Sequence, residues 1–318
     1  MLEKYQKVID LALKEFIAEN SLNNSFKSIE YILRLKAKRI RPSLLLMSAD
    51  LFGGDFSKYI NQALAIELFH NFTLLHDDIM DKAPIRRGKA SVHTKWDINT
   101  AILSGDFLYA YSLQCMYKDA GDKLSEIMYV FNKTSIEICE GQSLDMQFED
   151  MQEISTDEYI KMISLKTAVL LACSLKIGSI VTSANDIDKQ AIYNFGLYLG
   201  IAFQMKDDVL DIYAEDDFGK RMGGDILENK KTILYVLAYK YGDDSQKNIL
   251  SNNSFKDEDI RISQVVSIYN KLEILHKSDS LIDKYYNLAL CEIDKLSLAR
   301  KQKDKLYQFS EHIFNRKI

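Results

Sequence analysis

Proline, the residue that most reliably ends a helix, occurs only twice in this chain of 318 residues, at Pro42 and Pro84. Glycine, which weakens helices, occurs 13 times. So few helix breakers allow long helices, because little in the local chemistry stops them. Hydrophobic residues make up 47% of the chain and charged residues 27%, which is typical of a globular protein and excludes collagen-like and disordered classes.

Apolar residues recur at helical spacing along most of the chain. The pattern predicts helices at about 2–19, 59–82, 99–118, 123–147, 157–180, 188–213, 230–241, 258–276 and 280–314. No Asn-Gly or Asp-Gly pair and no convincing alternation of period two argues for a hairpin. No linker rich in proline, glycine or serine divides the chain. We therefore predict an all-α fold, a single domain over residues 1–318 that forms a bundle of long helices around a central cavity.

The net charge and the cysteines indicate which kinds of partner and which cellular compartment to expect. The formal net charge is -5, which gives no reason to expect a nucleic-acid partner. The four cysteines, Cys115, Cys139, Cys173 and Cys291, are far apart and form no CxxC pair. They indicate reduced thiols in a cytoplasmic protein. No apolar run approaches the roughly 18 residues of a membrane span, so none is expected.

Two aspartate motifs of identical spacing, LLHDDIMD and QMKDDVLD, each end a long apolar helical pattern. Positions i and i+4 share one face of a helix, so the outer two aspartates of each motif lie together and repel each other. Such a pair calls for a cation, and all-oxygen ligands favour Mg²⁺ together with substrate phosphates. A solvated acidic face is the alternative, which two copies within apolar sequence make less plausible. The six residues are Asp77, Asp78, Asp81, Asp207, Asp208 and Asp211.

Basic clusters accompany both motifs and suit a diphosphate, because arginine forks bind phosphate oxygens in pairs. A lysine and threonine, Lys166-Thr167, also interrupt an apolar pattern where they could reach an anion. A solvated surface position is the simpler interpretation for Lys89, Arg221 and Lys231. No GxSxG, HExxH, Walker A or GxGxxG motif occurs, which argues against hydrolases, zinc proteases, NTPases and dinucleotide oxidoreductases. The clustered basic residues are Lys38, Arg39, Arg41, Arg86, Arg87, Lys89, Lys220 and Lys230.

The sequence resembles the trans-isoprenyl diphosphate synthases, the polyprenyl synthetase family. The resemblance rests on KRIRP, HNFTLLHDDIMD, RRGKASVH, GQSLD, SLKT, FQMKDDVLD, GGDI and NKKT, which occur in this order from residue 38 to residue 232. It implies the isoprenoid synthase fold, a homodimer, and head-to-tail condensation of isopentenyl diphosphate with an allylic diphosphate. In that reaction the allylic diphosphate leaves as pyrophosphate, the cation alkylates the double bond, and a proton is lost.

The resemblance also implies a role for each matching residue. Asp77, Asp81 and Asp207 would bind Mg²⁺, as three ions with substrate present, and Asp78, Asp208 and Asp211 would support them. The allylic diphosphate would be bound by Arg86, Lys166 and Lys220. Isopentenyl diphosphate would be bound by Lys38, Arg41, His70 and Arg87, with Phe203 lining its site. Lys230 would be a further basic contact. Thr167 and Gln204 would present oxygens near the cation, and Gln142 and Asp145 would lie behind these groups.

Residues before the first motif set the product length in this family. Phe72 lies five positions before Asp77 and is followed by the small Thr73. A phenyl ring there would block a growing tail, so we predict a short product, geranylgeranyl diphosphate in preference to farnesyl diphosphate. The floor could instead lie at Tyr109 or Tyr111. Other functions left open are a class I terpene cyclase, a medium-chain polyprenyl diphosphate synthase or a subunit of one.

Overall fold

The computed structural model describes residues 2–21, 26–213, 223–252, 254 and 257–314. The chain divides into two compact units. Unit 1 is Met1–Asn132 with Cys173–Gln190, and unit 2 is Lys133–Ala172 with Ala191–Ile318. Almost all of the described secondary structure is helical, so the all-α prediction is confirmed. The single domain with a central cavity stays a prediction, and each unit is described by itself.

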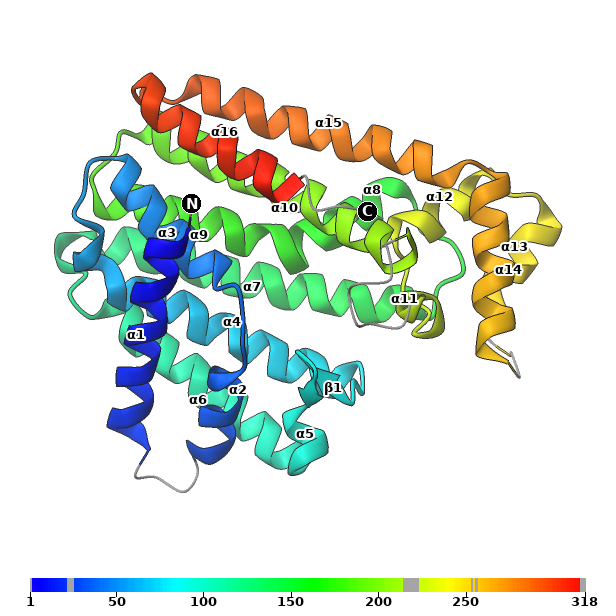
Figure 1. Ribbon diagram of the computed structural model, residues 1–318, viewed down its shortest axis with the longest axis horizontal. Helices are drawn as coiled ribbons and strands as arrows, with labels where there is room; N and C mark the ends of the chain where they lie inside the picture. Colours follow the sequence, from blue (N-terminus) through cyan, green and yellow to red (C-terminus); the bar gives the residue numbers. More distant parts are fainter. Residues whose placement is uncertain (1, 22–25, 214–222, 253, 255–256, 315–318) are drawn as a thin grey trace. The chain divides into compact units, whose positions relative to one another are not determined.

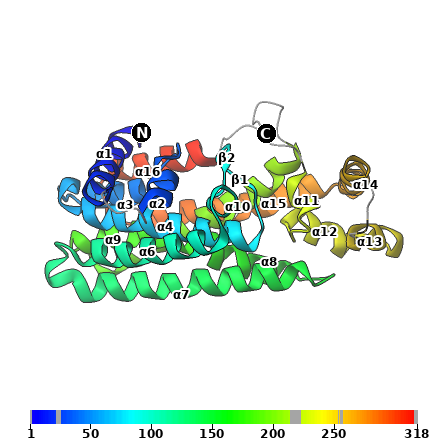
Figure 2. The same ribbon diagram turned by 90° about the horizontal axis from the view of Figure 1, so that it is seen from below.

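Unit 1 is built around α4, whose neighbour α6 runs beside it (Figures 1 and 2). The α4 helix is apolar on most of its surface and buries residues along nearly its whole length, which marks it as a core helix. The elements within unit 1 are α1 (Glu3–Asn20), α2 (Lys27–Arg34), α3 (Ile40–Leu51), η2 (Phe56–Tyr59), α4 (Ile60–Met80), β1 (Ile85–Arg86), β2 (Lys89–Ala90), α5 (Val92–Lys95), α6 (Ile98–Tyr117) and η3 (Gly121–Lys123).

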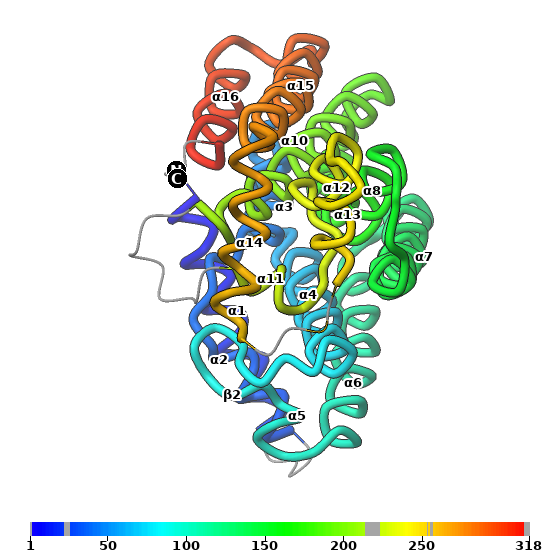
Figure 3. Tube along the Cα trace, turned by 90° about the vertical axis from the view of Figure 1, so that its right-hand side faces the viewer, coloured from blue at the N-terminus to red at the C-terminus, as the bar shows by residue number. Residues whose placement is uncertain are grey.

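Three helices contribute residues to both units, and the elements that remain lie in unit 2. In unit 2, α16 packs on α15, and Figure 3 draws the pair in red and orange. The three shared helices are α7 (Leu124–Glu149), α9 (Val169–Val181) and α10 (Asp186–Tyr213). Those of unit 2 are α8 (Thr156–Ile163), the π-helical turn η4 (Ser164–Ala168), α11 (Gly224–Leu227), α12 (Ile233–Tyr241), α13 (Asp244–Ser251), α14 (Glu258–Lys271), α15 (Ile274–Lys295) and α16 (Arg300–Phe314).

Polar side chains explain where several helices begin. Asp97 accepts a hydrogen bond from the Thr100 backbone amide and starts α6. Ser155 and Glu158 form a capping box that starts α8, and the Thr232 side chain caps α12. Each cap satisfies backbone N–H groups that the first turn leaves unpaired and contributes about 1 kcal/mol.

The sequence pattern misplaced some helices. The single pattern predicted over 280–314 is wrong, because α15 ends at Lys295 and α16 begins at Arg300. Leu296, which ends α15, has an extended backbone and is buried, so the apolar spacing continues through the break. The pattern also missed α2, α3 and α13. Pro42 lies in the first turn of α3, where proline is tolerated because that turn has spare N–H groups.

Candidate active site

The first aspartate motif lies at the C-terminal end of α4. Asp81 follows the last helical residue, and its backbone N–H still donates to the Asp77 carbonyl oxygen at 2.8 Å. Asp77 and Asp81 therefore remain one turn apart on the same face, and both are partly exposed. Asp78 points elsewhere, because only 1% of its surface is exposed. The outer carboxylates are thus accessible to a cation, whereas the middle one is not.

Arg86 is the partner of the buried Asp78. Its Nε donates to Asp78 Oδ1 at 2.8 Å, and its Nη2 contacts the same oxygen. Burial raises the pKa of Asp78, although the Arg86 guanidinium opposes this shift. Burial acts in the other sense on Arg86, but Asp78 outweighs it and leaves the arginine pKa raised. Arg86, predicted to bind the allylic diphosphate, is therefore held at the first motif by an ion pair.

A small hairpin carries Arg86 and Arg87. Strands β1 and β2 pair antiparallel, and Arg87 and Gly88 between them both have positive φ, 53° and 74°. Two such residues form the type I′ turn that suits the twist of a hairpin. The sequence prediction missed this hairpin because an arginine occupies the first turn position, where the left-handed conformation costs about 1–2 kcal/mol. The only signal was Gly88. The Tyr31 hydroxyl donates to the Ala90 carbonyl oxygen at 2.8 Å and fixes the hairpin to α2.

The four residues predicted to bind isopentenyl diphosphate gather around one basic hollow in unit 1. The hollow has a volume of about 290 Å³. Among the described residues that line it, Glu67 has the only carboxylate, so this lining is positively charged. A hollow of this kind fits an anion. The residues that line it are Lys36, Ala37, Lys38, Arg39, Ile40, Arg41, Glu67, His70 and Arg87.

His70 and Arg87 show how the charge of the hollow is set. Burial and four neighbouring arginines hold the pKa of His70 well below its usual range, so this histidine is neutral. Arg41 Nη1 lies 3.2 Å from His70 Nε2 and can only donate, so Nε2 accepts and Nδ1 carries the proton. Burial lowers the pKa of Arg87, and its buried Nη1 has no hydrogen-bond partner among the described residues. A bound anion would satisfy that group.

Arg39 supports this hollow from behind, a role that the sequence did not reveal. Its side chain is buried and donates from Nη1 to Glu67 Oε1 at 2.5 Å. Its Nη2 donates to the carbonyl oxygens of Leu33 and Leu35 at 2.7 and 3.3 Å, and its own backbone is left-handed, with φ 45°. Arg39 thus holds the segment between α2 and α3, which contains Lys38, against α4.

An aromatic group lies along α4 behind the first motif. The Phe72 ring centroid is 5.4 Å from that of Phe69, 5.3 Å from that of Tyr109 and 4.8 Å from that of His76. The Thr73 hydroxyl donates back to the His70 carbonyl oxygen at 2.8 Å. Tyr111 packs on Phe16 and Phe26 instead. The structure therefore places Tyr109 with Phe72 and leaves Tyr111 out of this group.

The second aspartate motif lies in the last two turns of α10. Asp208 is 5% exposed and accepts hydrogen bonds from the Tyr159 hydroxyl at 2.6 Å, the Ile233 backbone N–H at 3.0 Å and Gln204 Nε2 at 3.0 Å. Burial raises its pKa to about 6, and these three donors oppose the shift. Asp207 and Asp211 are partly exposed, and Asp211 Oδ2 also accepts from the Asp225 backbone N–H at 3.1 Å.

Lys166 and Thr167 lie on the π-helical turn η4, where the sequence predicted an unbroken helix. No proline or glycine within this turn marks it in the sequence, but two glycines on other helices approach it closely. A Cβ added to Gly141 of α7 would lie 2.7 Å from the Lys166 Cα, and one added to Gly200 of α10 would lie 2.7 Å from the Ala168 Cα. These approaches are closer than real Cβ atoms adopt, so only glycine permits both of them.

Asp145 joins two of the predicted basic residues. Its Oδ2 accepts from Lys166 Nζ at 2.6 Å and from Lys230 Nζ at 3.3 Å, and Lys230 also donates to Glu149 Oε1 at 2.6 Å. Burial acts to raise the pKa of Asp145, but the two lysines outweigh it and leave the pKa lowered. Unit 2 thus holds a cationic pair on a shared carboxylate.

Other predicted residues have mixed outcomes. Phe203 lies on α10 beside Gln204 and is partly exposed. Gln142 is buried, and neither side-chain polar atom has a hydrogen-bond partner within the described part of the chain. The surface interpretation of Lys231 is wrong, because the side chain is buried over the Tyr235 ring and donates to Asn229. Lys220 and Arg221 lie outside the described residues.

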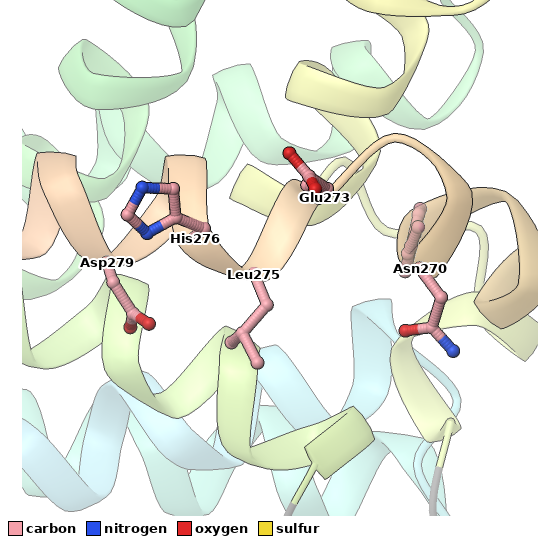
Figure 4. A pocket seen from close by; sticks show the side chains of 6 residues that line it. Asn270, Glu273, Leu275, His276 and Asp279 are labelled. Carbon is pink, nitrogen blue, oxygen red and sulfur yellow. The ribbon is translucent and has the colours of Figure 1, made fainter.

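A second hollow, of about 370 Å³, lies where α14 meets α15, and no predicted site residue lines it. In Figure 4, Glu273 and His276 point to one side of the chain, whereas Leu275 and Asp279 point to the other. The acidic and imidazole groups there do not converge. Among the described residues, no three His, Cys, Asp or Glu side chains are grouped closely enough to hold a metal ion alone. The paired carboxylates nevertheless fit Mg²⁺, which takes one or two carboxylates and completes its shell with water and phosphate.

Comparison with known proteins assigns the family. The polyprenyl synthetase model matches residues 23–272. A geranylgeranyl diphosphate synthase of Saccharolobus solfataricus is 36% identical over 309 residues, 92% of each chain. One of Methanosarcina mazei is 40% identical over 237 residues, 74% of this chain and 73% of the relative. The crystal structure of geranylgeranyl pyrophosphate synthetase from Pyrococcus horikoshii superposes with a TM-score of 0.93 at 32% identity, covering 99% of this chain and 97% of that one.

The chain belongs to the polyprenyl synthetase family, and it is a short-chain trans-prenyltransferase. The predicted fold class and enzyme class are confirmed. One stretch of the described residues, Thr156–Val181, is long and apolar enough to cross a membrane by composition alone. Of its most apolar window, 72% is buried inside the protein, which is typical of a core helix.

Proposed function

We propose that the chain condenses isopentenyl diphosphate with an allylic diphosphate and releases mainly geranylgeranyl diphosphate. The observation that carries the proposal is the basic hollow of unit 1, which gathers Lys38, Arg41, His70 and Arg87 and leaves a buried guanidinium nitrogen of Arg87 without a partner among the described residues. A diphosphate supplies the oxygens that such a group lacks. The relatives named geranylgeranyl diphosphate synthases support the same substrate class.

The outer aspartates would hold the metal that the reaction needs. Asp77, Asp81 and Asp207 are partly exposed carboxylates and offer oxygen ligands only, which fits Mg²⁺, and we propose three ions with substrate bound. When bound, Mg²⁺ neutralises the charge that develops on the departing diphosphate. Asp211 shares this face of α10, and its carboxylate accepts a hydrogen bond from the Asp225 backbone N–H, which ties α11 to the motif.

The basic residues would bind and orient the allylic diphosphate. Lys166 and Lys230 share Asp145, so one of them can turn toward an incoming anion while the other keeps the carboxylate paired. Arg86 is held beside the first motif by Asp78. Fixed donors of this kind favour the state in which the leaving diphosphate carries the most charge. Lys220 would contribute in the same way.

The aromatic group would limit the length of the product. Phe72 contacts Phe69, Tyr109 and His76, so its ring cannot move aside without disturbing three others. Thr73 is small and its hydroxyl is turned back to the helix, so it adds no second barrier. A rigid ring one turn behind the metal-binding aspartates suits a product of twenty carbons or fewer.

We also propose that the protein is a cytoplasmic homodimer. Leu103 and Phe107, one turn apart on α6, are 57% and 42% exposed, and a second copy of the chain would cover these apolar side chains. Analytical ultracentrifugation tests this, with a sedimentation coefficient of a dimer expected. A monomer for the wild type would contradict the proposal, and Phe107→Glu should weaken the dimer.

Incorporation of labelled isopentenyl diphosphate tests the reaction itself. The purified chain is incubated with dimethylallyl, geranyl or farnesyl diphosphate, with Mg²⁺ or with excess chelator, and the products are dephosphorylated and separated by chromatography. We expect Mg²⁺-dependent label in a twenty-carbon alcohol. Products of thirty-five carbons would indicate a medium-chain synthase, and a cyclic hydrocarbon from primer alone would indicate a terpene cyclase. No incorporation with any primer would contradict the proposal or indicate a subunit that needs a partner.

A further inference from the structure

Four side chains of unit 2 form a continuous chain of hydrogen bonds that ends at a residue outside the predicted site. The Tyr159 hydroxyl donates to Asp208 Oδ2 at 2.6 Å, and Gln204 Nε2 donates to Asp208 Oδ1 at 3.0 Å. The Thr167 hydroxyl donates to Gln204 Oε1 at 2.9 Å. The chain joins α8, α10 and the π-helical turn η4. It is anchored further by the Ile233 backbone N–H, which donates to Asp208 at 3.0 Å.

The chemistry of these groups allows only one arrangement. An ionised carboxylate has no proton and can only accept, so Gln204 must turn its NH₂ group toward Asp208. The Gln204 carbonyl oxygen then faces Thr167. A hydroxyl has one proton, and Thr167 gives it to that oxygen. The oxygen of Thr167 therefore has only lone pairs left for any other neighbour.

We propose that Tyr159 is a positioning residue, which acts through Asp208 to fix the Gln204 amide and so keeps the Thr167 hydroxyl proton away from the substrate. The inference rests on the proposed function and on the expectation, implied by the family resemblance, that the allylic cation forms near Thr167 and Gln204. Lone pairs stabilise a developing cation, whereas an N–H or O–H dipole with its hydrogen toward the cation opposes it. Asp208 thus acts as the centre of this chain of hydrogen bonds.

Burial gives the arrangement its rigidity. Tyr159 is 1% exposed and belongs to the apolar core of unit 2. Water cannot replace its hydroxyl there, so a variant without it leaves one Asp208 oxygen with the Ile233 N–H alone. A carboxylate with fewer donors no longer specifies the orientation of the amide as strongly. If Tyr159 were only a core residue, the loss of its hydroxyl would lower stability and leave turnover unchanged.

The test compares two buried tyrosines of the full chain. Tyr159→Phe removes the hydroxyl of the proposed chain. Tyr235→Phe is the matched control, because Tyr235 is also a buried residue of unit 2, but its hydroxyl donates to the Gln152 carbonyl oxygen at 2.7 Å. Measured are kcat, the KM for each diphosphate and the unfolding temperature. We expect kcat to fall about 10-fold or more in Tyr159→Phe with both KM values within about threefold, and to change less than about twofold in the control.

A second pair of variants tests the other end. Thr167→Ser keeps a hydroxyl donor and should retain kcat within about threefold, whereas Thr167→Val should lose about 10-fold or more. In the Thr167→Val background, Tyr159→Phe should cost little further, because both act through the same amide. This pair also serves if Tyr159→Phe does not fold.

The outcomes separate cleanly. The inference is overturned if Tyr159→Phe retains kcat within twofold, if Thr167→Val does so, or if the two effects multiply as independent factors. A wild type that incorporates no isopentenyl diphosphate overturns the proposed function, and the inference with it. Loss of turnover in the variants alone supports the positioning role.

Discussion

The two aspartate motifs have the same spacing, yet their middle carboxylates have different surroundings. Asp78, at the end of α4, is paired with the guanidinium of Arg86. Asp208, on α10, is surrounded by neutral donors, which are a tyrosine hydroxyl, a glutamine amide and a backbone N–H. Burial raises the pKa of both. For Asp78 the positive charge of Arg86 opposes the rise in pKa. For Asp208 only hydrogen bonds from neutral donors oppose it.

The difference teaches what a repeated motif does and does not specify. Spacing puts the outer aspartates on one face and turns the middle one away from it, and this holds in both motifs. The partner that the middle aspartate finds on the buried side of the helix depends on the residues of the surrounding unit. In unit 1 that side offers a cation on a hairpin, so Asp78 positions Arg86, which we propose binds phosphate. In unit 2 it offers neutral donors, so Asp208 positions an amide.

The largest effect should come from the residues that the two motifs share. Asp77→Ala and Asp207→Ala should each lower kcat about a thousandfold or more, because each removes a proposed Mg²⁺ ligand. Removing one of two like charges one turn apart should not destabilise the helix. Steady-state kinetics at saturating Mg²⁺ and thermal unfolding check both statements. If either variant keeps kcat within about tenfold, that motif is not a metal site and the comparison fails.

The next largest effect should come from the aromatic group around Phe72, which precedes the first aspartate motif. The residue five positions before the motif is Phe72 in the first and the buried Ala202 in the second. Phe72→Ala removes a ring that contacts three others and should lengthen the product by at least one five-carbon unit, measured by chromatography of the dephosphorylated alcohols. Tyr111→Ala is the matched control, because Tyr111 packs elsewhere, on Phe16 and Phe26. An unchanged product from Phe72→Ala, or a longer one from the control, contradicts the assignment.

The Asp78–Arg86 ion pair should contribute to the free energy of unfolding, and this contribution distinguishes it from the neutral donors around Asp208. Asp78→Asn leaves the partly buried Arg86 without its carboxylate and should lower the free energy of unfolding by about 1–3 kcal/mol, below the value for a fully buried pair because Arg86 is 29% exposed. The double variant Asp78→Asn/Arg86→Gln should lose little more than either single one. Chemical denaturation measures all three. Additive losses would show that the two side chains do not interact.

Sequence reasoning reached those parts of the site that local spacing determines. The two aspartate motifs, their helices and the basic clusters follow from periodicity and charge within a few residues. The π-helical turn at Lys166 did not, because nothing in its own sequence marks it and the glycines that approach it, Gly141 and Gly200, lie on other helices. Tyr159 was missed for the same reason, since it lies 49 positions from its partner Asp208.

Burial was the other quantity that the sequence could not supply. Arg39 and Lys231 each lie in a run of charged residues, and such runs are usually solvated. The structure buries both, Arg39 against Glu67 and Lys231 over Tyr235. The sequence prediction missed the hairpin at Arg87 because its turn lacks the usual asparagine or aspartate. Long-range contacts decide each of these cases.

The buried cations of the two units also differ in how their charge depends on pH. This difference gives the prediction with the smallest expected effect. The buried cations of the basic hollow in unit 1 include Arg39, and arginines stay charged at any ordinary pH. Unit 2 buries Lys231, and burial lowers its pKa to about 8. In the unfolded chain a lysine keeps a pKa of about 10.4. Between these values the unfolded state holds a proton that the folded state has lost, so stability rises with pH.

Lys231→Met should remove that dependence. From pH 7 to pH 9 the free energy of unfolding of the wild type should rise by about 1 kcal/mol relative to this variant, measured by denaturant unfolding at several pH values. Lys89→Met is the matched control, because Lys89 is exposed on the hairpin and its removal should leave the pH dependence of the wild type in place. A wild type and Lys231→Met with parallel pH profiles would show that Lys231 stays protonated in the folded protein. The contrast between the cations of the two units would then disappear.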